Sequence, residues 1–226
     1  MTSPVTVVGG TGRIGRLVVD GLLGQGVEVR VLSRRAGRAA DLARRGAKLY
    51  DADVRTGEGL EPPLGDTRAV VFSVEPGTAQ SGPDRPEATM YQGIVNVLNA
   101  CGPGVERFVL VSQIYVTRPE HSINQYGRML DWRLRGEDAI RAGGLPYTIV
   151  RPSWLTDRAG GAGLRLEQGD RGDGQVTRAD VAAACLHALT EPAAVGKTFE
   201  MYNEAGREPA AWGELFASLA PDPVGS

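Results

Sequence analysis

The sequence predicts an α/β fold of the Rossmann type, in which a doubly wound parallel sheet carries a small C-terminal lobe that covers the substrate. Stretches rich in β-branched residues alternate with stretches of helical periodicity over most of the chain, as parallel strands joined by right-handed helical crossovers require. A glycine-rich turn lies between the first such strand and the first such helix. After Pro152 the alternation gives way to a stretch rich in Gly, Asp and Arg. We therefore expect a single nucleotide-binding domain over residues 1–226, in which residues from about 152 onward form the substrate lobe.

The predicted strands are short, and Ala69–Val74 is apolar enough to be buried on both faces of a sheet. The other strands are expected at Val5–Val8, Val27–Leu32, Ala47–Tyr50, Arg107–Val111, Tyr147–Val150 and Thr198–Tyr202. The stretch Gly160–Gly174 has no periodicity, so we expect it to form a mobile surface loop near the ligand.

The predicted helices lie between these strands. An apolar stripe predicts a long helix at Asp84–Asn99, with Asp84 and Glu87 as its capping residues. The segment Thr177–Asp180 is typical of a capping box that opens the helix Ala179–Leu189. The remaining helices are expected at Arg13–Leu23, Ala36–Arg45, Ile123–Ala142 and Pro209–Leu219.

The composition is that of an ordinary globular protein that binds a small molecule. Hydrophobic residues make up 42% of the 226 residues, and the formal net charge of -2 predicts no attraction to nucleic acid or to a membrane. The segment Met1–Pro4 lacks the basic and apolar regions of a signal peptide, so we expect a cytoplasmic location. Cys101, Cys185, His121 and His187 do not have the spacing of metal ligands, so no metal site is expected. We expect a monomer or a homodimer.

The glycine-rich turn predicts a site for the pyrophosphate of a dinucleotide. Gly9, Gly12 and Gly15 have the spacing G-x-x-G-x-x-G. Residues without a Cβ let the backbone approach the phosphates, and the N-terminus of the following helix favours their negative charge. Cofactor contacts are expected from Gly9, Thr11, Gly12, Arg13, Ile14 and Gly15. In the alternative interpretation, the glycines only close a tight turn.

The end of the second strand predicts NADP(H) as the cofactor. An acidic residue at this place would bind the ribose hydroxyls of NAD, but the chain has Ser33, Arg34 and Arg35, which suit a 2′-phosphate. The alternative is a solvated basic surface. Asp53 and Val54 are expected to meet the adenine, although Asp53 could instead cap the next helix. Ser73 in the fourth strand is also expected to contact the cofactor, which completes the predicted cofactor site.

Together these motifs resemble the atypical short-chain dehydrogenase/reductases of the NmrA-like group. The shared segments are the turn Val7–Gly15, Asp53-Val54, Val111-Ser112, the Y-T-I-V-R-P sequence of Tyr147–Pro152, and Arg178–Ala182. The resemblance spans about residues 4–203 and implies a Rossmann-type core, a nicotinamide nucleotide and a substrate pocket over the carboxyl ends of the strands. It does not imply one reaction, because the group is similar in fold to reductases of quinones and flavins, to sugar-nucleotide epimerases and to redox-sensing regulators.

The pair Tyr-x-x-x-Lys, with which many short-chain reductases supply a proton and hold the nicotinamide ribose, is not intact. Tyr126 is followed four residues later by Leu130, and Arg133, which stands where relatives often have Lys, is preceded four residues earlier by Met129. Tyr126 and Arg133 lie two helical turns apart and are expected to share one helix face. The serine that ends the fifth strand in such enzymes is present as Ser112.

We therefore expect catalytic roles for Ser112, Tyr126 and Arg133, with Arg133 also donating to the nicotinamide ribose. Each residue also has an alternative, purely structural interpretation. Ser112 caps a strand end, Tyr126 packs on its helix, and Arg133 forms an i, i+4 ion pair with Glu137.

Tyr115, His121 and Trp154 are expected to contact the substrate. The favoured function is an NADPH-dependent reductase of a small conjugated acceptor, such as a quinone, a flavin or an enone, in small-molecule biosynthesis. Such an acceptor spreads the charge of the incoming hydride, so that solvent or Ser112 can supply the proton. Two alternatives remain, a non-redox isomerase, cyclase or dehydratase on the same fold and an NADP-binding redox sensor without turnover.

Overall fold

The computed structural model describes residues 4–223, and in this part of the chain eight strands form one sheet in the order β3-β2-β1-β4-β5-β6-β10-β8. Residues 1–3, part of the segment in which we expect no signal peptide, lie outside the described residues. The strands are β1 (Val5–Val8), β2 (Val29–Ser33), β3 (Lys48–Asp51), β4 (Ala69–Phe72), β5 (Arg107–Val111), β6 (Tyr147–Pro152), β8 (Leu164–Glu167) and β10 (Lys197–Asn203). All neighbours run parallel except β8, which is antiparallel to β10. The predicted Rossmann-type parallel sheet is confirmed.

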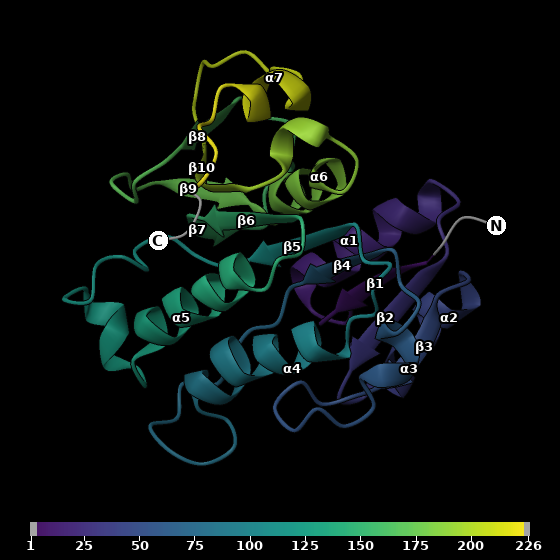
Figure 1. Ribbon diagram of the computed structural model, residues 1–226. Coiled ribbons are helices and arrows are strands. Elements are labelled where there is room, and N and C mark those ends of the chain that lie inside the picture. The colour runs from purple at the N-terminus through teal and green to yellow at the C-terminus, as the bar shows by residue number, and fades with distance from the viewer. Residues whose placement is uncertain (1–3, 224–226) are drawn as a thin grey trace.

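Helices cover both faces of the sheet (Figure 1). On one face α1 (Arg13–Gly24) packs against α6 (Arg178–Ala188), and on the other α4 (Gly93–Ala100) packs against α5 (Met129–Ala142). The shorter helices are α2 (Ala40–Arg44), α3 (Glu61–Leu64) and α7 (Trp212–Ala217). Because strand side chains alternate, Val7 faces the core beneath α1 and Val8 the core beneath α4, and each is fully buried.

The order of the strands reverses between β1 and β4, since the chain first builds outward to β3 and then returns to the other side of β1. In open parallel sheets a ligand binds beyond the carboxyl ends of the strands at this point of reversal. The glycine-rich turn after β1 and Ser73 after β4 both lie at this edge. The fold therefore places the predicted cofactor residues together.

The long helix expected at Ile123–Ala142 begins six residues later, so that prediction is wrong for its first part. Gly127 and Arg128 have φ of 62° and 57°, which no α-helix accommodates. Before them, Ser122–Gln125 form a 3₁₀ turn. The side chain of Asn124 accepts hydrogen bonds from the backbone N–H groups of Leu130 and Asp131 at 3.1 and 3.3 Å, and so caps the start of α5.

The helix expected at Asp84–Asn99 also starts late, because Asp84 pairs with arginines instead of capping. Its carboxylate contacts Arg55 at 2.5 Å and Arg34 at 3.3 Å. Glu87 forms no side-chain cap either, and a π-helical turn at Ala88–Gln92 precedes α4.

The stretch Gly160–Gly174 is not a loop throughout, which corrects the sequence-based expectation. It contains β8, which pairs with β10. On either side of the stretch in sequence, β7 (Trp154–Thr156) and β9 (Gln175–Thr177) pair with each other in a second, two-stranded sheet. Strands of three or four residues are too short for their alternation to be detected in the sequence. The capping box that opens α6 is confirmed, since the hydroxyl of Thr177 accepts from the backbone N–H of Asp180 at 3.0 Å.

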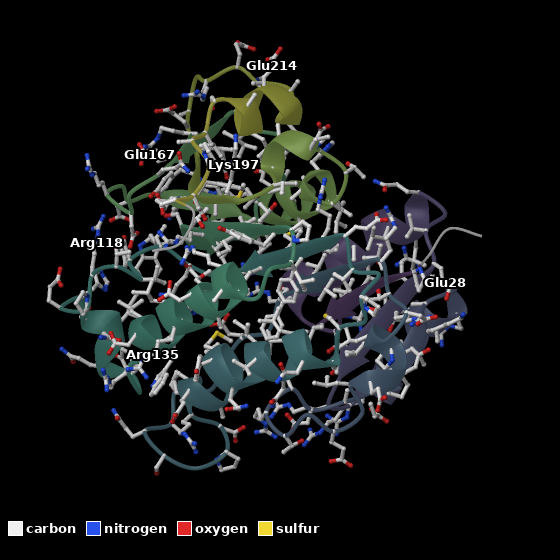
Figure 2. The ribbon with its side chains drawn as sticks, viewed as in Figure 1. Glu28, Arg118, Arg135, Glu167, Lys197 and Glu214 are labelled. Carbon is white, nitrogen blue, oxygen red and sulfur yellow. The ribbon has the colours of Figure 1, made fainter. Side chains whose placement is uncertain are left out.

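The C-terminal segment is fastened to the sheet by a buried lysine. Lys197, labelled in Figure 2, starts β10 and donates to the carbonyl oxygens of Phe216 and Leu219 at 2.6 and 2.7 Å. These carbonyls lie at the C-terminal end of α7, where a cation is favourable. Among the described residues, none of the helices has the length and apolar character needed to cross a membrane. Residues 4–223 also hold no cluster of three or more His, Cys, Asp or Glu side chains suited to a metal ion.

Candidate active site

The three glycines of the turn have different structural roles. Gly9 has φ of 81°, and a Cβ there would collide with the carbonyl oxygen of Ser73, while a Cβ on Gly15 would collide with the carbonyl oxygen of Gly9. Gly12 has an ordinary φ of -75° and a Cβ on it would lie 3.2 Å from the carbonyl oxygen of Gly9. Backbone packing therefore requires Gly9 and Gly15, whereas Gly12 leaves room for a ligand in the cavities that it lines.

The N-terminus of α1 fits a pyrophosphate. Gly12 occupies the capping position with no side-chain hydrogen bond, and the first turn holds no acidic residue. The helix is 12 residues long, and its first N–H groups point out of the turn without a capping partner from a side chain. Such an end attracts an anion through its N–H groups and its dipole.

Beside this turn, a cavity of about 240 Å³ fits an adenosine. Its walls include Leu32, Ala52, Val54 and Ser73, so Val54 and Ser73 lie where the sequence placed them. Asp53 also lines it, but the guanidinium of Arg55 binds its carboxylate at 2.9 Å and holds the pKa of Asp53 below its usual value.

A polar cavity adjoins the adenosine cavity and gathers the residues expected at the 2′-phosphate. Thr11 and Ser33 meet there with their hydroxyl oxygens 2.9 Å apart. Arg34 is exposed and reaches Asp84 at 3.3 Å. The lining residues with a positive charge are Arg16, Arg34, Arg35, Arg38 and Arg55. The residues present thus fit a dinucleotide. A 2′-phosphate bound here would replace the exposed carboxylate of Asp84 as the partner of Arg34 and would accept hydrogen bonds from two or three guanidinium groups.

A third cavity, of about 610 Å³, continues from the turn over the ends of β5 and β6. Most of its wall is apolar and comes from Ile14, Val74, Val111, Ile114, Ile123, Met129, Trp154 and Leu155. Its polar residues include Arg13, Glu75, Ser112, Arg133 and Arg178. Gly12, Ser73, Val74 and Glu75 line this cavity and the adenosine cavity alike, so the two are continuous. The arrangement lets a cofactor and an apolar substrate meet.

Ser112, which follows β5, lies at this cavity and donates its hydroxyl proton into the protein. Its oxygen is 2.6 Å from Oε1 of Glu137 on α5, a side chain with no exposed surface. Arg151 on β6 binds both oxygens of Glu137 at 3.0 and 2.6 Å, and Arg141 binds one at 2.9 Å. The Ser112 hydroxyl therefore meets a carboxylate that also accepts three hydrogen bonds from guanidinium groups.

Arg133 is buried at the same cavity, but it does not form the ion pair with Glu137 that the alternative interpretation predicts. Its guanidinium pairs with Glu75 at 3.0 Å, while Glu137, the alternative partner, is engaged by Arg151 and Arg141. The Nε–H of Arg133 is buried and has no hydrogen-bond acceptor among the described residues. Met129 lies one turn earlier on α5 and also lines the cavity.

Tyr126 does not join this constellation. It precedes α5, is 57% exposed and does not line the cavity, so the expectation that it shares a helix face with Arg133 is wrong. Tyr126 lies apart from Arg133 because the chain makes a left-handed turn at Gly127 and Arg128. The helical periodicity of the sequence does not predict this turn.

Of the three residues expected at the substrate, Tyr115 and Trp154 line the cavity and His121 does not. The ring of His121 stacks behind Tyr115 at 4.2 Å between centroids. The rings of Tyr115 and Trp154 are tilted against each other at 6.2 Å. Tyr115 is buried with φ of 71°, and burial raises the pKa of its phenol. These two rings form an aromatic wall.

The strained backbone of Tyr115 is held by Asp170, which itself has φ of 54°. Asp170 accepts from the backbone N–H of Tyr115 at 2.6 Å and of Thr117 at 3.0 Å. Its own N–H donates to Glu200 at 3.0 Å, and Arg118, labelled in Figure 2, donates to its carbonyl oxygen from Nε at 2.7 Å. Such outliers persist where the surroundings fix them and are common at binding sites.

Sequence reasoning missed Glu75, which carries no signal because it follows a strand without a motif. Arg13, which the sequence places at the cofactor, and Arg178, which belongs to a segment shared with the family, also line the substrate cavity. Asp157 binds both guanidinium groups between the N-termini of α6 and α1. Arg38 stands close enough to Arg34 in the sequence to have been counted with the phosphate residues.

Comparison with known proteins identifies the family. Residues 9–192 match the family model described as NAD(P)H-binding. An uncharacterized chloroplastic protein of Arabidopsis thaliana is 31% identical over 96% of this chain and 83% of its own length. Sanguinarine reductase of Eschscholzia californica is 34% identical, over 49% of this chain and 42% of its own length. Quinone oxidoreductase 2 of Escherichia coli is 23% identical over 89% of this chain and 69% of its own length.

Solved structures agree in fold. A putative NAD-dependent epimerase/dehydratase from Bacillus halodurans has a TM-score of 0.82 with 24% identity, over 96% of this chain and all of that chain. A short-chain dehydrogenase/reductase from Veillonella parvula in complex with NADP has a TM-score of 0.71 with 15% identity, over 93% of this chain and all of that chain. The chain therefore belongs to the family whose model is described as NAD(P)H-binding.

Proposed function

We propose that this protein reduces a small, planar, conjugated acceptor, such as a quinone, a flavin or an enone, with NADPH. The observation that carries the proposal is a cavity that joins a dinucleotide groove to an apolar, aromatic pocket and offers no tuned proton donor. The nicotinamide supplies a hydride when it is bound. This chain's residues orient the two partners and exclude water from the pocket, which is the main catalytic contribution that a hydride transfer needs.

The side chains at the cavity argue against an acceptor that needs strong acid catalysis. Tyr126 lies outside it, Met129 has no proton to give, and the guanidinium of Arg133 stays protonated. Ser112 directs its proton to Glu137, which argues against Ser112 as the proton donor. The pKa of Tyr115 is raised, so its phenol is a weak acid. An acceptor that delocalises the charge of the hydride and takes its proton from solvent is compatible with all five residues.

The choice of NADPH rests on the polar cavity at the end of β2. Three arginines of the segment 34–38 surround the hydroxyls of Thr11 and Ser33, and no acidic side chain ends the strand where a ribose diol would need one. Arg34 and its neighbours can bind the phosphate through charge-assisted hydrogen bonds.

A panel of acceptors tests the proposal. Purified protein with NADPH and quinones, flavins or enones should lose the absorbance of the reduced nicotinamide, and Tyr126→Phe should keep the wild-type kcat. Redox-neutral conversion of a ligand would favour an isomerase or cyclase, and tight NADP binding with no turnover would favour a sensor. A tenfold or greater loss of kcat in Tyr126→Phe would contradict the part of the proposal that dispenses with a tyrosine donor.

The assembly and the location extend the proposal. We expect a monomer or homodimer that acts on a small molecule in the cytoplasm, and sedimentation and cell fractionation test these two points.

A further inference from the structure

The hydrogen bond between Ser112 and Glu137 constrains what the cavity can bind. Ser112 is 5% exposed and lines the cavity, and its oxygen lies 2.6 Å from Oε1 of Glu137. An ionised carboxylate accepts hydrogen bonds and cannot donate one, so the serine must be the donor of this pair. What remains at the serine oxygen is a pair of acceptor sites.

The charges around Glu137 disfavour a protonated Glu137 that would donate its hydrogen bond to Ser112. Arg151 and Arg141 donate three hydrogen bonds to its two oxygens, and Arg151 also binds Glu200 at 2.9 Å. Glu137, Arg151 and Glu200 are all at least nine-tenths buried. Protonating Glu137 would remove the charge that these guanidinium groups require, and a buried guanidinium without its partner is strongly unfavourable.

We propose that Glu137 fixes Ser112 as a hydrogen-bond acceptor toward the cavity, so that the ligand group that binds against Ser112 carries an N–H or O–H donor. Glu137 is thus a positioning residue that acts through Ser112, and Ser112 selects ligands. The inference rests on the proposed function only in taking this cavity as the place where cofactor and acceptor meet.

The donor can come from either ligand of such an enzyme. The carboxamide of a nicotinamide ring carries N–H groups, and a hydroxylated acceptor carries an O–H group. Two matched pairs of ligands separate these sources. The oxidised cofactor is compared with its 3-acetylpyridine analogue, in which a methyl group replaces the amide nitrogen, and hydroxylated naphthoquinones are compared with their fluoro analogues.

Equilibrium binding is measured by calorimetric titration, so no turnover is needed. We expect wild-type protein to bind the donor-bearing member of one pair about five- to tenfold more tightly, which is the effect of one net hydrogen bond. Ser112→Ala should reduce that preference to about twofold or less, because the acceptor is gone. The melting temperature of each variant confirms that it is folded.

The variant Glu137→Gln tests the direction of the serine hydrogen bond. Two guanidinium N–H groups point at Oε2 and only one, the Nε–H of Arg151, points at Oε1, so the amide oxygen is favoured at the Oε2 position. The amide nitrogen then faces Ser112 and makes the serine the acceptor of that bond. The serine proton is then free to face the cavity, so the preference for a donor should disappear or reverse. Glu106→Gln, an exposed glutamate after the turn at residues 102–105, is the matched control and should keep the wild-type preference.

Each result bears on the proposal. Equal affinity within both pairs in the wild-type protein overturns it, as does a preference that survives in Ser112→Ala. A preference confined to the cofactor pair assigns the donor to the nicotinamide, and one confined to the naphthoquinones assigns it to the acceptor. If NADPH is not oxidised with any acceptor but the preference is present, the proposed function fails and this inference stands.

Discussion

Single residues of the phosphate-binding turn separate folding from cofactor binding. Gly12→Ala adds a Cβ at an ordinary φ with only a tight contact to a carbonyl oxygen, so the protein should fold. The methyl group would occupy the space that the pyrophosphate needs, and we expect the Kd for NADPH to rise at least tenfold, as judged by fluorescence titration.

Gly15→Ala is the contrasting variant. Its Cβ would collide with backbone atoms of Gly9 and Gly10, which a methyl group cannot displace cheaply. We expect a lower melting temperature together with weaker binding. If Gly12→Ala and Gly15→Ala melt at the same temperature, the division of roles between these glycines is wrong.

Arg34 is the residue at which cofactor choice is tested. Arg34→Ala removes a guanidinium that reaches only an exposed aspartate, so stability should change little. A hydrogen bond to a charged group contributes about 1.5–3 kcal/mol, so the Kd for NADPH should rise roughly tenfold or more while that for NADH stays constant. Arg44→Ala, at the end of α2 and not among the residues that line the cavity, is the control. A parallel loss of affinity for both nucleotides would remove the assignment of the phosphate site.

At the scale of elements, the start of α5 determines which residues face the cavity. Asn124→Ala removes the side-chain acceptor for the N–H groups of Leu130 and Asp131. Loss of such a cap costs about 1 kcal/mol, which should appear in denaturant unfolding as a lower midpoint with an unchanged slope. Because the same turn carries Met129 and Arg133, KM for the acceptor should rise as well. An unchanged unfolding midpoint would show that Asn124 does not cap the helix.

The sequence predicts elements well where one physical signal dominates. Arg107–Val111 was placed with its correct ends, since five residues rich in β-branched and apolar side chains at the centre of a parallel sheet leave little choice. The capping box at Thr177 was identified because its chemistry is local. By contrast, the left-handed turn at Gly127 and Arg128 depends on packing against Pro86 and Ala79, which are distant in sequence. Tyr126 was therefore misplaced.

The site was predictable to the same extent. The cofactor residues follow from a motif between a strand and a helix, whereas the Ser112–Glu137 pair joins β5 to α5 through a contact that has no sequence pattern. From the sequence, Glu137 is predicted only as an i, i+4 ion-pair partner of Arg133. Its true partners, Arg151 and Arg141, lie on β6 and one helical turn further along α5.

For the whole molecule, buried thiols predict a dependence of stability on alkaline pH. Burial raises the pKa of Cys185 to about 12 and that of Cys101 to about 11, from an ordinary value near 9.0. The folded state thus keeps protons that the unfolded state loses. The resulting stability is fully present below pH 9 and is lost as the pH rises toward the folded-state values.

We therefore expect the free energy of unfolding to fall from about pH 9 upward, by at most ~1.4 kcal/mol per pH unit for Cys185. Urea titrations at several pH values measure this slope. Cys185→Ala should lower the free energy of unfolding at neutral pH but make its decline above pH 9 less steep. An equal decline per pH unit in the wild-type protein and the variant would exclude the Cys185 thiol as the cause of the pH dependence.

The cavity proposed for the acceptor and the cavity proposed for the adenosine share Gly12, Ser73, Val74 and Glu75. A dinucleotide seated on these residues would form one side of the acceptor's pocket, so an acceptor that arrives first meets a pocket that lacks a wall. The two substrates should then bind in a compulsory order, with the nucleotide first and last. In steady-state kinetics this order makes NADP⁺ a competitive inhibitor against NADPH, and it makes NADP⁺ a noncompetitive inhibitor against the acceptor when NADPH is not saturating.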